Sequence, residues 1–343
     1  MYIKKLLALF LALALTVGLA GCGGETDNDV DERSEAEEAI SEISTAEQPS
    51  ETVTEVEIVT EVDDVETVII AGEEYRIDIK ELNLAGGKRY LPTGGLTDSD
   101  LAELYRFTNL TTLKLECNEI SSIDFVAYMP NLTFLDVMDN NISDISVLSN
   151  LTKLETLMFN GEYVNDISAL ENLKLLNTLY IIDLSNGDLS VLSNLPIEKL
   201  YLENIPIYDL SILPNSLKRI SFPDCHIEDI SSMSHLVNLE SIGMRSNKIK
   251  NIEVLLNFRN LKELYLGGCN LYNSDVNHIS NLTNLEMLSL SNNNISNISA
   301  LSNLKHLQRL NLELNPVKEE DIQKLQNEMP WCEIKYLTSF GID

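Results

Sequence analysis

The chain has 343 residues and a formal net charge of −30, from 54 Asp and Glu against 24 Lys and Arg. A chain this acidic lacks the basic surface that nucleic acid requires, which excludes a nucleic-acid-binding role. None of its five Cys stands in a CxxC pair, so no zinc site is expected.

The first 21 residues have the layout of a secretory signal peptide. Lys4 and Lys5 precede the apolar run 6–17, which is too short to cross a membrane as a helix, and small residues follow within 18–21. The ending Leu-Ala-Gly-Cys resembles the lipobox of bacterial lipoproteins. That resemblance implies cleavage before Cys22 and a lipid on its thiol, which would anchor the mature chain, outside the cytoplasm, to the bacterial cell membrane. An ordinary cleavage site that leaves a free Cys is the alternative.

Residues 22–64 are expected to form the lipidated Cys and an acidic, disordered tether. Seventeen acidic side chains and one Arg lie between positions 25 and 66, with little apolar surface to bury. Self-repulsion favours an extended chain there. The stretch 52–62 alternates Val or Ile with Glu or Thr and could form a strand, but it has no obvious partner strand.

Residues 65–109 are predicted to form an N-terminal cap and an irregular first repeat. Strands near 68–70 and 75–79 flank an Ala-Gly turn, and the irregular repeat opens at Ile79. A capping-box-like start at 97–100 predicts a helix of two to three turns after it. Together these elements would cover the open end of the array that follows.

Residues 110–315 repeat one pattern, seen most clearly in the 22 residues 132–153 (LTFLDVMDNNISDISVLSNLTK). Apolar residues occupy positions 1, 4, 6, 11, 14, 17 and 20, and Asn140 stands at position 9. This L-x-x-L-x-L-x-x-N-x-I signature is typical of leucine-rich repeats. The ten units start at Leu110, Leu132, Leu154, Leu176, Ile197, Leu217, Leu239, Leu261, Leu285 and Leu307. The pattern predicts an α/β leucine-rich repeat solenoid, with a curved parallel sheet on the concave face and short 3₁₀ or helical turns on the convex face.

Two polar positions within each unit are interpreted as structural. Position 9 should point inward and satisfy backbone groups at the bend, with Cys225 and Cys269 acting there as small, weak donors. That ladder is interrupted between Asn140 and Asn247, where looser or altered curvature is expected. Asp or Asn at position 13 should cap the convex turn rather than bind metal.

The array ends in a predicted C-terminal cap at 316–343. The eighth unit inserts two residues after Leu271, which favours a fuller helix. Residues 319–328 form an amphipathic pattern and 331–334 an edge strand. We expect no further domain and no cell-wall sorting motif after them.

The stretch 110–336 resembles the internalin-like class of bacterial leucine-rich repeat proteins. The phrase Asn-Asn-Ile-Ser-Asp-Ile-Ser at 140–146 carries most of that resemblance. It implies the solenoid fold and a ligand-binding or adhesive role, with no particular partner. The chain departs from the adhesins of that class because it lacks their immunoglobulin-like domain and wall anchor.

Positions 3, 5 and 7 should face the concave surface, because positions 4 and 6 point into the core. Units 2 to 5 place large apolar side chains there. They are Phe134, Met138, Met158, Tyr180, Ile182 and Tyr201, with the acidic residues Asp136, Asp139, Asp183 and Glu203 at the rim. Aromatic and Met side chains are typical of interface centres, so we predict that a protein or peptide binds here. The alternative is a ladder that stabilises only the sheet.

An enzyme is not expected. The four His occupy convex or loop positions, and the chain has no GxSxG, no HExxH and no Gly-rich phosphate loop. We predict no cofactor and no metal, although calcium among the rim acids stays an alternative. The expected molecule is a monomer with free thiols at Cys117, Cys225, Cys269 and Cys332. A passive structural lipoprotein of the envelope and a host-contact adhesin are the competing functions.

Overall fold

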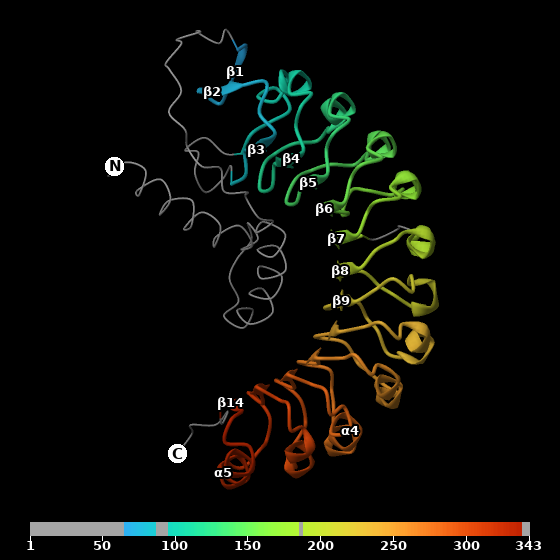
Figure 1. Cartoon of the computed structure of the whole chain (residues 1–343), viewed down its shortest axis with the longest axis vertical. Helices are drawn as coiled ribbons and strands as arrows, with labels where there is room; N and C mark the ends of the chain where they lie inside the picture. The colour runs from blue at the N-terminus through green and yellow to red at the C-terminus, as the bar shows by residue number, and fades with distance from the viewer. Residues whose placement is uncertain (1–64, 87–94, 185–187, 338–343) are drawn as a thin grey trace, which may run out of the picture.

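The computed structural model describes residues 65–86, 95–184 and 188–337. The predicted signal peptide, Cys22 and the tether lie outside these residues, as does 338–343. The repeats form an open arc in which the strands line the inner edge and the turns the outer edge (Figure 1). Of the helices in the described ranges, none is both long enough and apolar enough to cross a membrane.

The inner edge is a twelve-stranded sheet whose strands follow chain order from β3 to β14. Neighbouring strands are parallel and in register at every step, as in Leu113 beside Leu135 and Leu135 beside Leu157. The strands are β3 (Glu81–Asn83), β4 (Thr112–Lys114), β5 (Phe134–Asp136), β6 (Thr156–Asn160), β7 (Thr178–Ile182), β8 (Lys199–Glu203), β9 (Arg219–Ser221), β10 (Ser241–Gly243), β11 (Glu263–Tyr265), β12 (Met287–Ser289), β13 (Arg309–Asn311) and β14 (Glu333–Lys335). The prediction of a leucine-rich repeat solenoid is confirmed.

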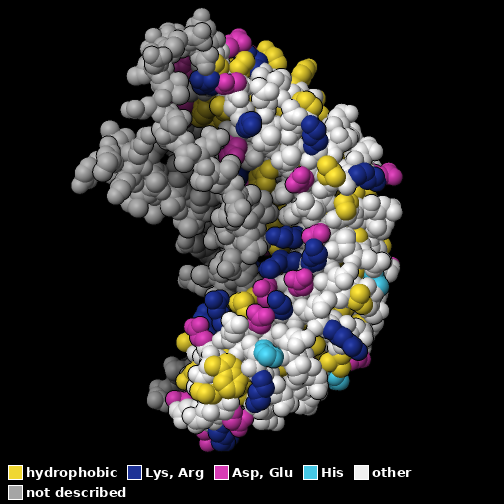
Figure 2. All heavy atoms as spheres, viewed as in Figure 1, with side chains coloured by type: hydrophobic (Ala, Val, Ile, Leu, Met, Phe, Trp, Pro, Cys, Tyr) yellow, Lys and Arg dark blue, Asp and Glu magenta, His cyan; other side chains and the backbone are white. Residues whose placement is uncertain are grey.

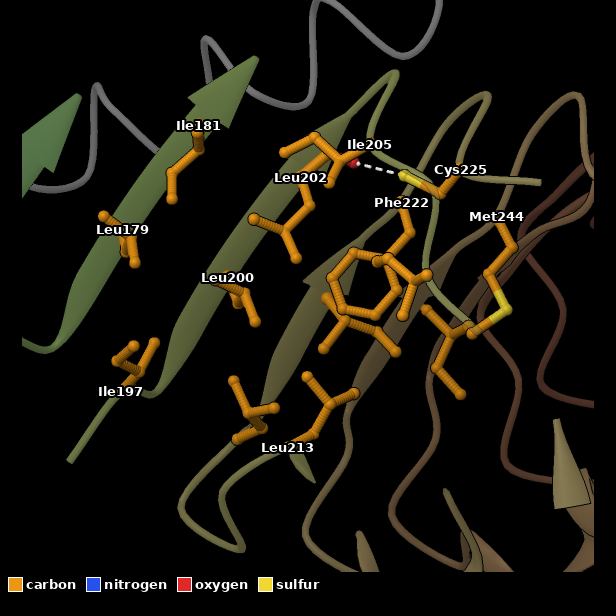
Figure 3. Close-up of a cluster of buried hydrophobic side chains, with 14 of the residues drawn as sticks. Leu179, Ile181, Ile197, Leu200, Leu202, Ile205, Leu213, Phe222, Cys225 and Met244 are labelled. Carbon is orange, nitrogen blue, oxygen red and sulfur yellow. Dashed lines mark hydrogen bonds between the residues drawn. The ribbon is translucent and has the colours of Figure 1, made fainter. Parts of the chain in front are cut away.

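The core is one continuous stack of the apolar repeat positions. Leu200 and Leu202 lie on β8 at positions 4 and 6 of their repeat unit and are fully buried. The equivalent residues of the neighbouring units are buried as well. Figure 3 shows these side chains pointing from the sheet toward the turn residues, such as Leu213. Each unit therefore buries its apolar face only against the units beside it, which is how a solenoid is stabilised.

The outer edge is built mainly of single 3₁₀ turns, because apolar residues spaced by three align on one side of such a turn. These are η1 (Leu104–Arg106), η2 (Asp124–Tyr128), η3 (Ser146–Asn150), η4 (Ser168–Asn172), η5 (Leu189–Asn194), η6 (Leu210–Ile212), η7 (Ser231–His235), η8 (Ile252–Asn257) and η9 (Ser299–Asn303). Two α-helices also lie on this edge, α4 (Asn273–Ile279) and α5 (Glu319–Glu328).

The predicted caps at position 13 are confirmed in six units. The backbone N–H of Ser146 donates to Asp144 Oδ1 at 2.8 Å, and Ser231 donates to Asp229 Oδ1 at the same distance. The equivalent pairs are Ser168 with Asp166, Ser190 with Asp188, Ser211 with Asp209 and Ser299 with Asn297. Asn251 is the exception, because its backbone is left-handed and its amide donates instead to Asp229.

The Asn ladder at position 9 is also confirmed. Asn293 Nδ2 donates to the carbonyls of Leu266 and Leu290 at 2.8 and 2.9 Å, and its Oδ1 accepts from Leu271 N–H. Cys225 takes the same place, and its thiol donates to the Leu202 carbonyl at 3.0 Å (Figure 3). In the units that carry Asn or Cys at position 9, a single inward side chain thus satisfies the buried backbone groups where the chain leaves the strand.

The looser or altered curvature expected between Asn140 and Asn247 stays a prediction, and the strands of units 3 to 5 are longer than the others. Strands β6, β7 and β8 each span five residues, whereas all other strands of this sheet span three. In unit 3 a tight turn replaces the inward Asn, and Val164 N–H donates to the Gly161 carbonyl at 3.0 Å. A Cβ at position 161 would lie 2.8 Å from Leu184 Cδ1, so the absent side chain makes room for Leu184.

The N-terminal cap agrees with prediction in its hairpin but not in its helix. β1 (Thr67–Ile70) and β2 (Glu73–Arg76) pair antiparallel around Ala71 and Gly72, both with positive φ. The expected helix of two to three turns is replaced by turns and the short η1, because Leu101, Leu104 and Phe107 are buried at a spacing of three.

The remaining end elements agree with prediction. Helix α4 forms in the lengthened eighth unit, where Tyr272 N–H donates to Asp275 Oδ2 at 2.8 Å. Helix α5 buries Ile322 and Leu325, and β14 closes the sheet. The cysteines at 117, 225, 269 and 332 are free thiols, as predicted.

Candidate binding face

The concave row at position 5 brings the predicted site residues together. Strand register places Asp136 beside Met158, Met158 beside Tyr180, and Tyr180 beside Tyr201. The four side chains come from β5, β6, β7 and β8 and form one line across the strands. Sequence spacing alone predicted this line, because one residue per 21 or 22 falls on it.

The two tyrosines of this row stack on each other. Their ring centroids lie 5.3 Å apart with an interplanar angle of 18°. Stacked aromatic rings gain about 0.5–1.5 kcal/mol beyond the area that they bury. The pair therefore forms a rigid, flat aromatic surface in the middle of the sheet.

Rows 3 and 7 flank the tyrosines. Phe134 lies at position 3 of β5, and the Lys114 ammonium is 5.3 Å from its ring centroid, a cation–π distance. At position 7, register places Ile182 between Asn160 and Glu203. We call the six predicted apolar residues the concave centre. They are Phe134, Met138, Met158, Tyr180, Ile182 and Tyr201, of which Phe134, Tyr180 and Ile182 are half-buried and the other three are buried.

The acidic residues predicted at the rim occupy different environments. Asp136 is buried, with 8% exposure, and accepts the Met138 N–H at 3.0 Å. Burial and the neighbouring Glu116 raise its pKa well above the usual value for Asp. Burial also raises the pKa of Glu116, whose Oε2 has no hydrogen-bond partner among the described residues. We call Glu116, Asp136 and Asp139 the acidic end of the face.

Asp139 and Asp183 serve the turn that leaves the strand. Both have positive φ, 52° and 63°. Asn160 Oδ1 accepts from Asp139 N–H at 2.6 Å, and Asn204 Nδ2 donates to Asp183 Oδ1 at 2.6 Å. Asp and Asn tolerate the left-handed region better than most side chains, which explains their recurrence at position 8.

The concave face also has a basic end that sequence reasoning did not single out. It consists of Lys199, Arg219 and Arg245 on the consecutive units that carry β8, β9 and β10. Arg219 pairs with Glu263 at 3.0 Å. Between the two arginines the concave surface is formed by small residues, Ser221 and Gly243, which are neighbours at position 5. The repeat spacing assigns Lys199 and Arg219 to position 3 and Arg245 to position 7 of their units, so the sequence contained the signal for these residues.

Other polar features lie away from this face. No group of three or more His, Cys, Asp or Glu that could hold a metal occurs within the described ranges. A hollow of about 440 Å³ has Glu240, Lys262, Glu286 and His306 among its lining residues. The face shown in Figure 2 mixes acidic, basic and apolar side chains. Within the described part of the chain, the sheet centre is therefore the strongest candidate for a binding surface.

Comparison with known proteins supports the repeat assignment. Residues 259–317 match the family described as leucine rich repeat, and residues 130–172 match leucine rich repeats in two copies. A search of curated protein sequences finds no match.

Solved structures with the same architecture come from several organisms. An internalin (InlF) of Listeria monocytogenes is 26% identical, with a TM-score of 0.54 over 78% of this chain and 85% of that chain. A leucine-rich repeat protein of Leptospira interrogans is 24% identical, with a TM-score of 0.53, and the match covers 68% of this chain and 62% of that chain. A chain of the mouse RP105/MD-1 complex is 19% identical, with a TM-score of 0.55 over 76% of this chain and 47% of that chain. The protein is a leucine-rich repeat solenoid, and it is similar in structure to an internalin and to other bacterial leucine-rich repeat proteins.

Proposed function

We propose that this protein is a non-catalytic binding module that holds a protein or peptide on its concave centre. The observation that carries the proposal is the stacked Tyr180–Tyr201 pair on the sheet, flanked by Met158 and Ile182. Leucine-rich repeat solenoids are typical scaffolds for protein–protein contacts, and Tyr, Met and Phe are enriched in the centres of such contacts. Leucine-rich repeat proteins are generally non-catalytic, and the concave centre consists of Tyr, Met, Ile and Phe, the residue types of a contact surface.

The test is capture of a partner by the full chain from envelope and secreted proteins, followed by an affinity measurement on Tyr180→Ser/Tyr201→Ser. The double variant should bind the captured partner more weakly by roughly 2–4 kcal/mol, because two aromatic anchors are lost. Tyr208→Ser is the matched control, since Tyr208 is 88% exposed and lies outside the concave rows. Unchanged affinity in the double variant, together with weakened binding by the control, would move the interface away from the concave centre.

We further propose that a lipid on Cys22 anchors the protein outside the cytoplasm, at the bacterial cell membrane. The Leu-Ala-Gly-Cys sequence after a short apolar run supports this, as does the acidic stretch that separates Cys22 from the first described strand. A lipid at that point would leave the concave centre facing extracytoplasmic proteins. This location agrees with a binding role and also with the alternative of a passive envelope lipoprotein.

Replacing the lipidated residue tests the anchor. Cys22→Ser should abolish labelling by a radioactive or clickable fatty acid and leave the protein unprocessed or released. Cys332→Ser is the control, because Cys332 is buried in the C-terminal cap and should not affect labelling. If the Cys22 variant still partitions into detergent like the parent, there is no lipobox.

A further inference from the structure

The concave face carries opposite charges on either side of its apolar centre. The acidic end lies at β4 and β5, and Lys114 beside it is directed at the Phe134 ring. The basic end lies at β8 to β10, where Glu263 pairs with Arg219 and Glu203 ends β8. This separation is unexpected in a chain with a net charge of −30, because acidic side chains would outnumber basic ones on a face of average composition.

The acidic end contains one carboxylate oxygen without a donor in the described part of the chain. Glu116 Oε2 is buried without a hydrogen-bond partner there, and a buried carboxylate oxygen in that state is costly. Burial raises the pKa of Glu116 and of Asp136, and the charge of Glu116 raises the pKa of Asp136 further, so a nearby cation would stabilise both charged forms. A ligand with an ammonium or guanidinium group meets this requirement.

The basic end combines donors with a floor of small residues. Ser241 and Gly243 are buried, and a Cβ on Gly243 would lie only 3.2 Å from Ser221 Oγ. The Cγ of Arg245 lies 3.8 Å from the place where a Cβ of residue 267 would be, so its stem extends over Gly267 toward the next unit. Arginine side chains over a low floor present N–H groups to a carboxylate, which they bind in a bidentate geometry.

The spacing of the two ends suits a short extended segment. From β5 to β9 or β10 there are four or five strand steps of about 4.8 Å, or about 19–24 Å. An extended peptide advances about 3.3 Å per residue, so about six or seven residues cross this distance. The apolar side chains of such a segment would lie over Met158, Tyr180 and Tyr201.

We propose that the bound segment is an extended peptide that crosses the strands, with a cationic group at the acidic end and a carboxylate at the basic end. This inference rests on the proposed function and specifies its partner: a peptide of about seven residues with separated opposite charges and an apolar middle. Charge complementarity sets the direction in which the peptide lies across the sheet, and the Tyr180–Tyr201 pair supplies the contact area.

Selection of peptides on the full chain tests the proposal. The probes are two random synthetic heptapeptide libraries, one with both ends blocked and one with a free carboxyl end, so that an acidic side chain and a terminal carboxylate can be told apart. Peptides retained by the wild type should be enriched about tenfold in those with Lys or Arg near one end and a carboxylate near the other. No retention, or retention without this charge separation, would overturn the proposal.

Charge variants then locate each end. Asp136→Lys should shift the retained peptides to those acidic at both ends, and Arg245→Glu to those basic at both ends. Asp136→Asn and Arg245→Gln are milder variants that should reduce the enrichment even if the reversals fold poorly. The controls Glu171→Lys and Lys250→Glu make the same charge changes on exposed residues of the outer side and should leave selection unchanged. An unaltered preference in all four concave variants would contradict the inference.

The two proposals fail in different ways. If Tyr180→Ser/Tyr201→Ser keeps full affinity while the charge preference persists, the concave centre is not the anchor but the charged ends still select. If the tyrosine variant loses binding and charge preference is absent, the proposed function stands and the dipolar peptide is wrong.

Discussion

The amide of Asn247 serves four backbone groups at once. Its Nδ2 donates to the carbonyls of Phe222, Met244 and Arg245 at 2.7, 2.9 and 3.0 Å, and its Oδ1 accepts from Ile227 N–H at 2.8 Å. Water cannot replace these bonds, because Asn247 is only 2% exposed. At residue scale, the fold therefore depends on a few inward polar side chains as much as on leucines.

Asn247→Ala should lower the free energy of unfolding by about 2–4 kcal/mol, since it leaves several buried backbone groups unpaired. Urea unfolding followed by circular dichroism measures the change. Asn303→Ala, on an exposed convex position, should change it by less than about 0.5 kcal/mol. A loss below about 1 kcal/mol for Asn247→Ala would mean that the ladder bonds contribute little.

The thiol at Cys225 should be inert in the folded protein. Burial raises its pKa to about 12, so the reactive thiolate is scarce near pH 8. Burial likewise raises the pKa of Cys332 to about 11. Iodoacetamide labelling with peptide mapping should modify the partly buried Cys117 first and reach Cys225 only after unfolding. Rapid native labelling of Cys225 would contradict its inward placement.

The Asp caps of the convex turns make the free energy of unfolding depend on pH. Hydrogen bonds from Ser231 and Asn251 lower the pKa of Asp229 from 3.8 to about 2. Because the folded pKa lies below the unfolded one, the carboxylate stabilises the fold above about pH 3.8, and this contribution is lost as the pH falls toward 2.

Asp229→Ala should therefore unfold at lower urea than the parent at pH 6, and the difference should shrink at pH 2.5. Asp229→Asn is the matched variant, because Asn297 caps Ser299 in the same way without titrating. The Asn variant should remove most of the pH dependence at this site. An equal loss for Asp229→Ala at both pH values would show that the charge is unimportant.

Neighbouring side chains on one strand separate core from surface. On β7, Leu179 is at position 4 of the repeat unit and is fully buried, whereas Tyr180 is at position 5 and lies on the concave side. Leu179→Ala should cost about 2–5 kcal/mol of stability through the cavity that it leaves. Tyr180→Ser/Tyr201→Ser should cost less, about 0.5–1.5 kcal/mol for the lost stack.

Chemical unfolding of both variants decides between the two interpretations of the aromatic row. A tyrosine variant that is destabilised as much as Leu179→Ala, with unchanged affinity for the captured partner, would assign the tyrosines to sheet stability alone. The binding role requires the reverse, a small loss of stability and a large loss of affinity.

Most of the strands and turns could be predicted from the sequence, because each repeat position recurs in many units. Register, the inward ladder and the caps were predictable since Asn140, Asn247 and Asn293 fall on one position. The structure of the stretch where the Asn ladder is interrupted was not predictable. There Gly161 leaves room for Leu184, because a side chain at position 161 would clash with it. The helix expected after residue 100 also failed, since a spacing of three fits a 3₁₀ turn as well as an α-helix.

The candidate site was predictable in position but not in environment. Position 5 placed Tyr180 and Tyr201 on one row, and the structure adds their stacking. Spacing could not reveal the burial of Asp136 or the Glu116 oxygen that lacks a partner among the described residues, because both depend on how neighbouring side chains fill the face. The small residues between the arginines of the basic end became evident only from the register of β9 and β10, which places Ser221 beside Gly243.

At the scale of the whole molecule, the solenoid assigns the core and the concave surface to different repeat positions. Each unit contacts mainly its neighbours, so positions 4 and 6 maintain the array while positions 3, 5 and 7 can vary. The long strands β6 to β8 lie in the middle of the arc and carry most of the concave centre (Figure 1). A partner bound there would be held by the most extensively paired part of the sheet.

The central claim is that a partner contacts the concave centre, and site-specific photo-crosslinking tests it most directly. p-Benzoylphenylalanine is an aromatic, photo-reactive amino acid that can replace Tyr201 on the concave face or Tyr208, which is 88% exposed outside it. After irradiation with the captured partner, position 201 should give a covalent adduct and position 208 should give none. Adducts from position 208 with none from position 201 would contradict the account.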